Sequence, residues 1–127
     1  RIAALLTAQV AAARERGVGP DPETSSVVDS FQNPEAVTGR TRKLVAPTPA
    51  LPTGAVDAAA GMEALTRSRA SMITSLHNAN GVALGGLVQT HPVLGAMNMY
   101  HWIIALALHD DRHAAQIREI GASVAAS

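Results

Sequence analysis

The segment WIIALALHDDRHAAQIREI, Trp102–Ile120, decides the fold that we predict for this chain. Apolar and histidine side chains recur in it at spacings of three and four, the period of one face of an α-helix. We therefore expect a helix from about Asn98 to Ile120, ended by Gly121. Its buried stripe is predicted to contain Trp102, Leu106, His109, His113, Gln116 or Ile117, and Ile120.

His109 and His113 give this helix its chemistry. Residues four apart project from adjacent turns on the same face, so the two imidazoles can converge on one cation, at about 2.0–2.1 Å for zinc. One inward histidine is usually a hydrogen-bonded core residue, whereas two in register bury two polar rings that need a partner. The pattern predicts that His109 and His113 bind a metal ion. The alternative is a pair that is hydrogen-bonded within a dry core.

A catalytic metal usually has a third protein ligand and an open position. The other candidates, His77, His91 and His101, are more typical of surface or loop histidines. Asp110 makes the segment resemble the zincin pattern His-Glu-x-x-His, but a zincin needs glutamate as its general base, so a metalloprotease is disfavoured. Asp110, Gln116 or a loop carbonyl could hold the second ring nitrogens of the ligands.

Two further helices are predicted. The first spans Arg1 to Arg16, with Ile2, Leu6, Val10 and Ala13 on its buried face. The second spans about Ala58 to His77, with Asp57 as its N-cap. Its buried face is expected to contain Met62, Leu65, Met72 and Leu76. Arg69 falls on the same stripe, where a charge either reaches the edge or serves a polar site.

The segments between these helices are predicted to be mostly irregular. Ser25–Phe31 is a candidate short helix, and Asn33-Pro34 a turn or helix start. We expect Arg40–Gly54, basic and then rich in proline, to cross the surface in an extended form. Glycines and a proline favour a loop from Asn78 to Gly95, with at most one loose helical turn. With no convincing alternating strand, the fold class is all-α.

Composition narrows the function classes. The 127 residues suit a single domain, 1–127, and the chain is 47% hydrophobic but only 2% aromatic, which favours close helix packing. Ten basic and ten acidic side chains cancel, which argues against nucleic acid as a partner. No apolar run approaches the roughly 18 residues of a membrane span. The absence of cysteine excludes thiolate sites and leaves the cytoplasm as the default location.

The chain resembles the C-terminal part of DinB-like proteins, whose superfamily includes the YfiT-like metal-dependent hydrolases. The resemblance rests on His91-Pro-Val-Leu-Gly95, Tyr100-His-Trp102 and His109-Asp-Asp-Arg-His113-Ala-Ala-Gln-Ile117. Looser agreement comes from Arg42-Lys43-Leu-Val-Ala-Pro47 and from a helix that carries Arg67 and Arg69. The final motif is fairly specific, while the middle of the chain is not.

The resemblance implies a four-helix bundle with a long crossover, and a divalent metal, zinc or nickel, held by three histidines. His109 and His113 match two of them. The third belongs to the bundle's second helix, which we align with the residues from Arg1 onward. That ligand is therefore expected upstream of Arg1, together with the bundle's first helix.

The resemblance also implies a reaction class and partners. Relatives include S-transferases that use bacillithiol or mycothiol, and isomerases that depend on glutathione or mycothiol. We therefore expect a metal-dependent enzyme, either a hydrolase or a thiol-dependent S-transferase, whose metal activates a bound water or thiol. Its substrate is expected to be a small molecule, such as a low-molecular-weight thiol. Arg69 could bind an anionic group, and Tyr100 and Trp102 could line the pocket mouth. A homodimer is expected for a bundle with a thin core. The alternative is a bundle in which the metal or the histidines are purely structural.

Overall fold

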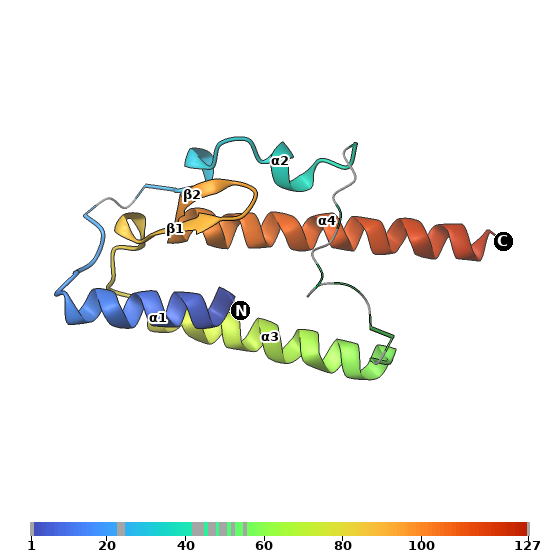
Figure 1. The fold of residues 1–127 in the computed structure, drawn as a ribbon, viewed down its shortest axis with the longest axis horizontal. Helices are drawn as coiled ribbons and strands as arrows, with labels where there is room; N and C mark the ends of the chain where they lie inside the picture. Colours follow the sequence, from blue (N-terminus) through green and yellow to red (C-terminus); the bar gives the residue numbers. More distant parts are fainter. Residues whose placement is uncertain are drawn as a thin grey trace. The chain divides into compact units, whose positions relative to one another are not determined.

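The computed structural model describes every residue except 1, 23–24, 42–44, 46–47, 49–50, 52, 55 and 127. It is mostly helical with one small sheet, in agreement with the helical class expected. In chain order the elements are α1 (Ile2–Glu15), the 3₁₀ turn η1 (Val28–Ser30), α2 (Glu35–Thr38), α3 (Ala58–Asn78), the 3₁₀ turn η3 (Leu84–Gly86), β1 (Val88–His91), β2 (Gly95–Asn98) and α4 (Met99–Ala125) (Figure 1).

The chain divides into two compact units. The first unit consists of Arg1–Pro22 and Lys43–Leu84, and the second of Glu23–Arg42 and Gly85–Ser127. The first unit therefore contains α1 and α3, and the second contains α2, the two strands and α4.

In the first unit, α1 and α3 lie side by side and run in the same direction (Figure 1). The hydroxyl oxygens of Thr7 and Ser75 are 3.1 Å apart. Further along both helices, Arg14 donates to the backbone carbonyls of Asn78 and Asn80. Because the partner numbers rise together along both helices, the pair is parallel.

The predicted buried face of α1 is confirmed at Leu6, Val10 and Ala13, whereas Ile2 is half-buried, and the predicted face of α3 is confirmed only in part. Leu6, Val10 and Ala13 are all at most 4% exposed. On α3, Met62 and Leu65 are 62% and 54% exposed. The register explains this difference: α3 has 21 residues against 14 in α1, and Thr7 lies beside Ser75. The first turns of α3 therefore have no described α1 residue opposite them.

The predicted N-cap of α3 is also confirmed. Asp57 has extended backbone angles, and its side chain accepts a 2.8 Å hydrogen bond from the backbone N–H of Ala60. This bond satisfies one of the amide groups that a helix leaves unpaired at its start.

In the second unit, an antiparallel hairpin precedes α4. β1 and β2 pair from Val88 opposite Asn98 to His91 opposite Gly95. Gly95 adopts a φ of +78°, which suits glycine at the end of the turn. The ring nitrogen Nδ1 of His91 accepts hydrogen bonds from two turn amides, those of Val93 and Leu94, both at 3.1 Å. The hairpin is thus closed by a histidine side chain.

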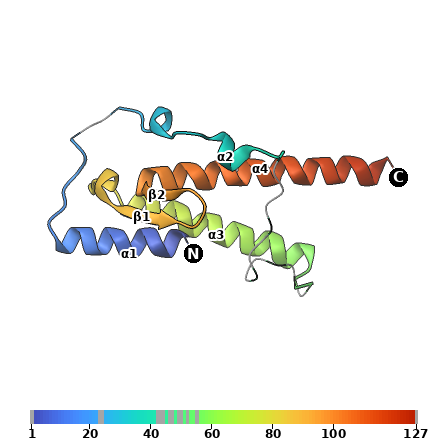
Figure 2. The same cartoon turned by 45° about the horizontal axis from the view of Figure 1, so that its top comes forward.

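α4 packs on this hairpin at its start and on α2 further along (Figure 2). Val37, Met97 and Ala105 form the buried centre of the second unit. Phe31, Leu94, Trp102 and Leu108 pack around it. Two arginines fasten α2 and the residues after it to α4: Arg112 donates to the carbonyl of Val37 at 3.2 Å, and Arg40 forms a two-pronged ion pair with Glu119.

Two predictions about local structure were wrong. The segment Asn78–Gly95, expected to be a loop, includes the strand β1, which pairs with β2. The final helix does not stop at Gly121 but continues to Ala125. Gly121 lacks the positive φ that ends a helix, and the penalty of about 1 kcal/mol for helical glycine is too small to break a long helix by itself.

The weaker predictions had mixed outcomes. The candidate helix Ser25–Phe31 contains only the turn η1, and α2 begins just after Asn33-Pro34. Much of the predicted surface connection Arg40–Gly54, including Arg42 and Lys43, lies outside the described residues. None of the described helices combines the length and the apolar character needed to cross a lipid bilayer.

Candidate metal-binding site

The middle of α4 brings the two predicted ligands together. The Nε2 atoms of His109 and His113 are 3.1 Å apart, and the two ring centroids are 4.3 Å apart. The rings meet nearly edge to face, at 83°. The spacing of four residues on a regular helix produces this approach, because it places the second side chain one turn above the first.

Gln116 orients His113 from the next turn of the same helix. Its amide oxygen Oε1 lies 2.7 Å from Nδ1 of His113. Since an amide oxygen only accepts hydrogen bonds, the Nδ1 of His113 must carry the hydrogen. In a neutral ring, the Nε2 of His113 then carries a lone pair and no hydrogen. That lone pair faces His109. The expected role of Gln116 as a partner for a second ring nitrogen agrees with this contact.

The expectation that the pair is enclosed in an apolar seam is wrong. Both histidines are exposed, and Ile117 and Ile120 further along the stripe are 69% and 64% exposed. The apolar members of the stripe are partly buried only as far as Leu106. The physical reason is that the hairpin and α2 cover the earlier turns of α4 within this unit.

The surroundings of His109 nevertheless shift its protonation equilibrium. The pKa of His109 is lowered, first because its ring is partly desolvated, and next because a charge on His113 would repel its own. Asp110 opposes this shift, while Arg112 and His91 add to it. His109 is therefore biased toward the neutral form, which is the form that binds metal.

The donor set suits two positions of a transition-metal site. For two nitrogens bound at about 2.05 Å in tetrahedral geometry, the nitrogen–nitrogen separation is about 3.3 Å. The 3.1 Å between the two Nε2 atoms is close to that value. Without a metal, the same geometry permits one hydrogen bond, with Nε2–H of His109 donating to Nε2 of His113. The arrangement can therefore either chelate a cation or form a hydrogen-bonded chain that ends at Gln116.

Two of the other histidines, His91 and His101, make contacts of their own, and His77 is exposed. His91 uses Nδ1 to close the hairpin, and its ring meets that of Trp102 at a tilt of 56° with the centroids 4.8 Å apart. His101 has its Nε2 3.0 Å from the hydroxyl oxygen of Ser30. His77 lies exposed at the end of α3, in the first unit. Among the residues that the structure describes, no group of three metal-ligating side chains is present.

Tyr100 and Trp102 belong to the start of α4, and Arg69 belongs to the first unit. Trp102 packs against the core of the second unit and donates its indole N–H to the carbonyl of Gln89 at 3.1 Å, which is ordinary core packing. Tyr100 is half-buried at the start of α4. Arg69 is exposed on α3, in the first unit.

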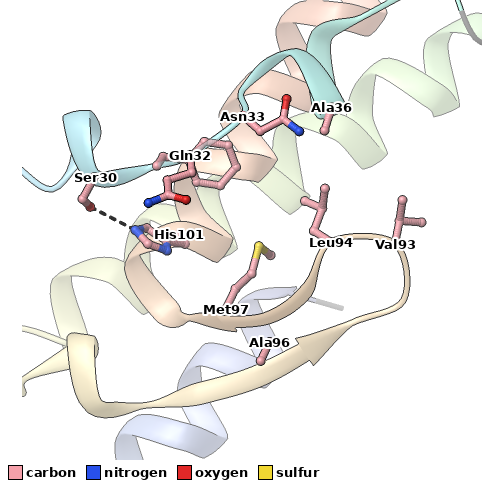
Figure 3. A pocket seen from close by; sticks show the side chains of 10 residues that line it. Ser30, Gln32, Asn33, Ala36, Val93, Leu94, Ala96, Met97 and His101 are labelled. Atoms are coloured by element: carbon pink, nitrogen blue, oxygen red, sulfur yellow. Dashed lines mark hydrogen bonds between the residues drawn. The ribbon is translucent and has the colours of Figure 1, made fainter.

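One feature that the sequence did not predict is a pocket of about 440 Å³ in the second unit (Figure 3). It lies between the segment that joins η1 to α2 and the β1–β2 hairpin. The turn signal at Asn33-Pro34 marks one wall, but the opposite wall comes from residues about 60 positions later. Only the folded chain brings them together.

No family model, curated protein or solved structure matches this chain.

Proposed function

We propose that this chain is a DinB-like protein that binds a divalent metal, zinc or nickel, through His109 and His113. The supporting observation is the 3.1 Å approach of the two Nε2 atoms, with Gln116 holding the far nitrogen of His113. Ligating histidines typically donate their other N–H to an oxygen acceptor, which fixes the tautomer. The Gln116 contact is such an acceptor.

The proposal places the chain in a four-helix bundle of the DinB type, with His109 and His113 as two of the ligands of the metal. Such a metal, when bound, would lower the pKa of a water or thiol in its open position. The role of this chain's own residues is then to hold two imidazole lone pairs in position and, through Gln116, to keep one of them in the right tautomer. The substrate we propose is a small molecule, such as a low-molecular-weight thiol and its electrophilic acceptor.

The test is a metal titration with matched variants. Zinc and nickel are titrated by calorimetry into the wild-type protein and into His109→Ala, His113→Ala and His77→Ala. His77 is an exposed histidine in the other unit, so His77→Ala controls for non-specific binding to imidazole. We expect at least a tenfold loss of affinity in the first two variants and none in the control. Equal metal content in wild type and His109→Ala would refute the proposal.

Removing the metal with a chelator distinguishes a catalytic metal site from a structural one. A metal that only staples helices contributes to the free energy of folding, so its removal should lower the melting temperature strongly. A catalytic centre with an open position should lose thiol-transfer activity and keep most of its fold. The exposure of both histidines favours the second outcome, because an exposed pair joins few packed elements.

A further inference from the structure

The turn between β1 and β2 is held by a side chain that can gain a proton. Nδ1 of His91 accepts hydrogen bonds from the backbone amides of Val93 and Leu94, both at 3.1 Å. A ring nitrogen accepts only through a lone pair, so Nδ1 carries no hydrogen. The neutral ring therefore has its hydrogen on Nε2. A charged ring has hydrogens on both nitrogens and cannot accept either hydrogen bond.

These two hydrogen bonds fix a turn that reaches the core. Leu94 packs against the buried centre of the second unit. Figure 3 shows Leu94 on the turn, on the side of the segment that joins η1 to α2. The two strands have only four residues each, and His91 pairs with Gly95 at the end of their ladder. A hairpin this short is marginally stable by itself, so it depends on the contacts of its turn and on its packing against α4.

The elements around His91 carry few groups that could stabilise a charged ring. Residues 85–98, which include both strands and their turn, contain no Asp, Glu, Lys or Arg. On α4, the ring of His91 meets that of Trp102. The first three turns of α4, residues 99–109, also lack these four residue types. Their titratable side chains are Tyr100, His101 and His109.

Other charged groups either oppose the protonation of His91 or are exposed to solvent. A positive charge on His109 repels one on His91. Asp110, at the next position of α4, is exposed, and so are Asp29 on η1 and Glu35 on α2. Partial burial of the ring lowers the pKa of His91, because desolvation disfavours the charged form. The neutral, hydrogen-bonded form of His91 is therefore the one present at neutral pH.

We propose that His91 is an acid-sensitive latch of the hairpin: the neutral ring closes the turn, and protonation of Nδ1 opens it. A hydrogen on Nδ1 points at the two amide hydrogens of the turn, so both hydrogen bonds are lost. The turn then separates from the core together with Leu94. Because the folded pKa of His91 lies below the unfolded value of about 6.5, the closed hairpin is favoured above that pH and is lost progressively below it.

The test follows the hairpin by NMR in the metal-free protein, with a chelator present, from about pH 7.5 to about pH 4.5. Imidazole ¹⁵N shifts should place the hydrogen on Nε2 at neutral pH and give a pKa of His91 below about 6.5. Hydrogen exchange, corrected for its intrinsic pH dependence, follows the amides of Val93 and Leu94. Their protection should fall at least tenfold across the transition, the effect of losing two neutral hydrogen bonds. A hydrogen on Nδ1 at neutral pH, or protection that survives protonation of His91, would overturn the proposal.

Two substitutions at His91 separate the latch from other effects of acid. His91→Asn keeps an acceptor that can bond the amide two residues on, as in an Asx turn, but it does not titrate. It should protect Val93 at neutral pH and lose the fall in protection on acidification. His91→Phe keeps an aromatic ring against Trp102 but has no acceptor. Its turn amides should be unprotected already at neutral pH.

His109→Asn is the matched control, because it removes the titratable group of α4 whose charge acts on His91. The fall in protection should persist in this variant and shift to slightly higher pH, since a repulsive charge is gone. A fall that remains in His91→Asn, or that disappears in His109→Asn, would refute the latch. These outcomes are independent of the metal titration, which measures zinc and nickel affinity in separate samples.

Discussion

The Nε2 atoms of His109 and His113 lie 3.1 Å apart on consecutive turns of α4, and Gln116 on the following turn accepts from the far side of His113. Three side chains on one helical face thus form a continuous polar chain. These three side chains all belong to α4, so their geometry can be probed by substitutions that leave the packing of the unit in place.

Replacing Gln116 should weaken metal binding without removing a ligand. Gln116→Leu leaves the Nδ1–H of His113 without its acceptor, and loss of such partners typically lowers metal affinity by about 10- to 100-fold. Gln116→Glu keeps an oxygen acceptor and should bind zinc at least as well as the wild type. Calorimetric titration of both variants measures the difference. Equal zinc affinity in Gln116→Leu and wild type would show that Gln116 does not position His113.

The titration of His109 should depend on His113. In the metal-free protein the pKa of His109 is expected below the ordinary value of about 6.5, because of partial desolvation and then the charge of His113. In His113→Ala the charge contribution disappears and the pKa should rise, but not fully, since desolvation remains. NMR titration of the imidazole resonances measures both values. An unchanged His109 pKa in His113→Ala would mean that the rings do not interact in solution.

The same shift predicts how stability depends on pH. A histidine whose folded pKa is lowered binds fewer protons in the folded state than in the unfolded state, at pH values between the two pKa values. The free energy of unfolding should therefore fall as the pH drops below about 6.5 and level off below the folded pKa. Urea denaturation from pH 7.5 to pH 5 should show this fall, reduced in His109→Asn. An equal fall in the free energy of unfolding in the wild type and in His109→Asn would mean that other titratable groups cause it.

Gly121 offers a test of where α4 ends. The glycine is helical, and a Cβ added to it would meet no atom within 4 Å. Gly121→Ala should therefore raise helicity and stabilise the second unit by about 1 kcal/mol. Gly95→Ala is the matched contrast, because a φ of +78° makes alanine unfavourable by about 1 kcal/mol. Circular dichroism and chemical denaturation measure both. If Gly121→Ala destabilises the protein, the helix ends at Gly121 in solution.

Core packing of the first unit can be tested with two leucines. Leu6 is 1% exposed, so Leu6→Ala should destabilise the protein by about 3 kcal/mol through lost burial and a cavity. Leu65 on α3 is 54% exposed, and Leu65→Ala should change stability by less than about 0.5 kcal/mol. Thermal and urea unfolding compare them. A loss for Leu65→Ala as large as that for Leu6→Ala would mean that the early turns of α3 are packed in solution.

Local signals were enough for much of the secondary structure. The spacing of apolar residues by threes and fours located α1. The helices α3 and α4 begin after Asp57 and Asn98, close to where the sequence placed them. The β1–β2 hairpin was missed because four-residue strands give too few alternations to stand out among glycines. The signals that could have found it were the β-branched Val88 and Thr90 before a turn with Pro92 and Gly95.

By itself, the sequence determined that His109, His113 and Gln116 share one face of a helix, because helical periodicity fixes the neighbours of each side chain within a few residues. It did not determine how that face is covered, and both histidines proved exposed. The pocket between Ser30–Asn33 and the hairpin was decided by tertiary structure alone. Burial and cavities depend on which distant segments pack together, and no local period encodes that packing.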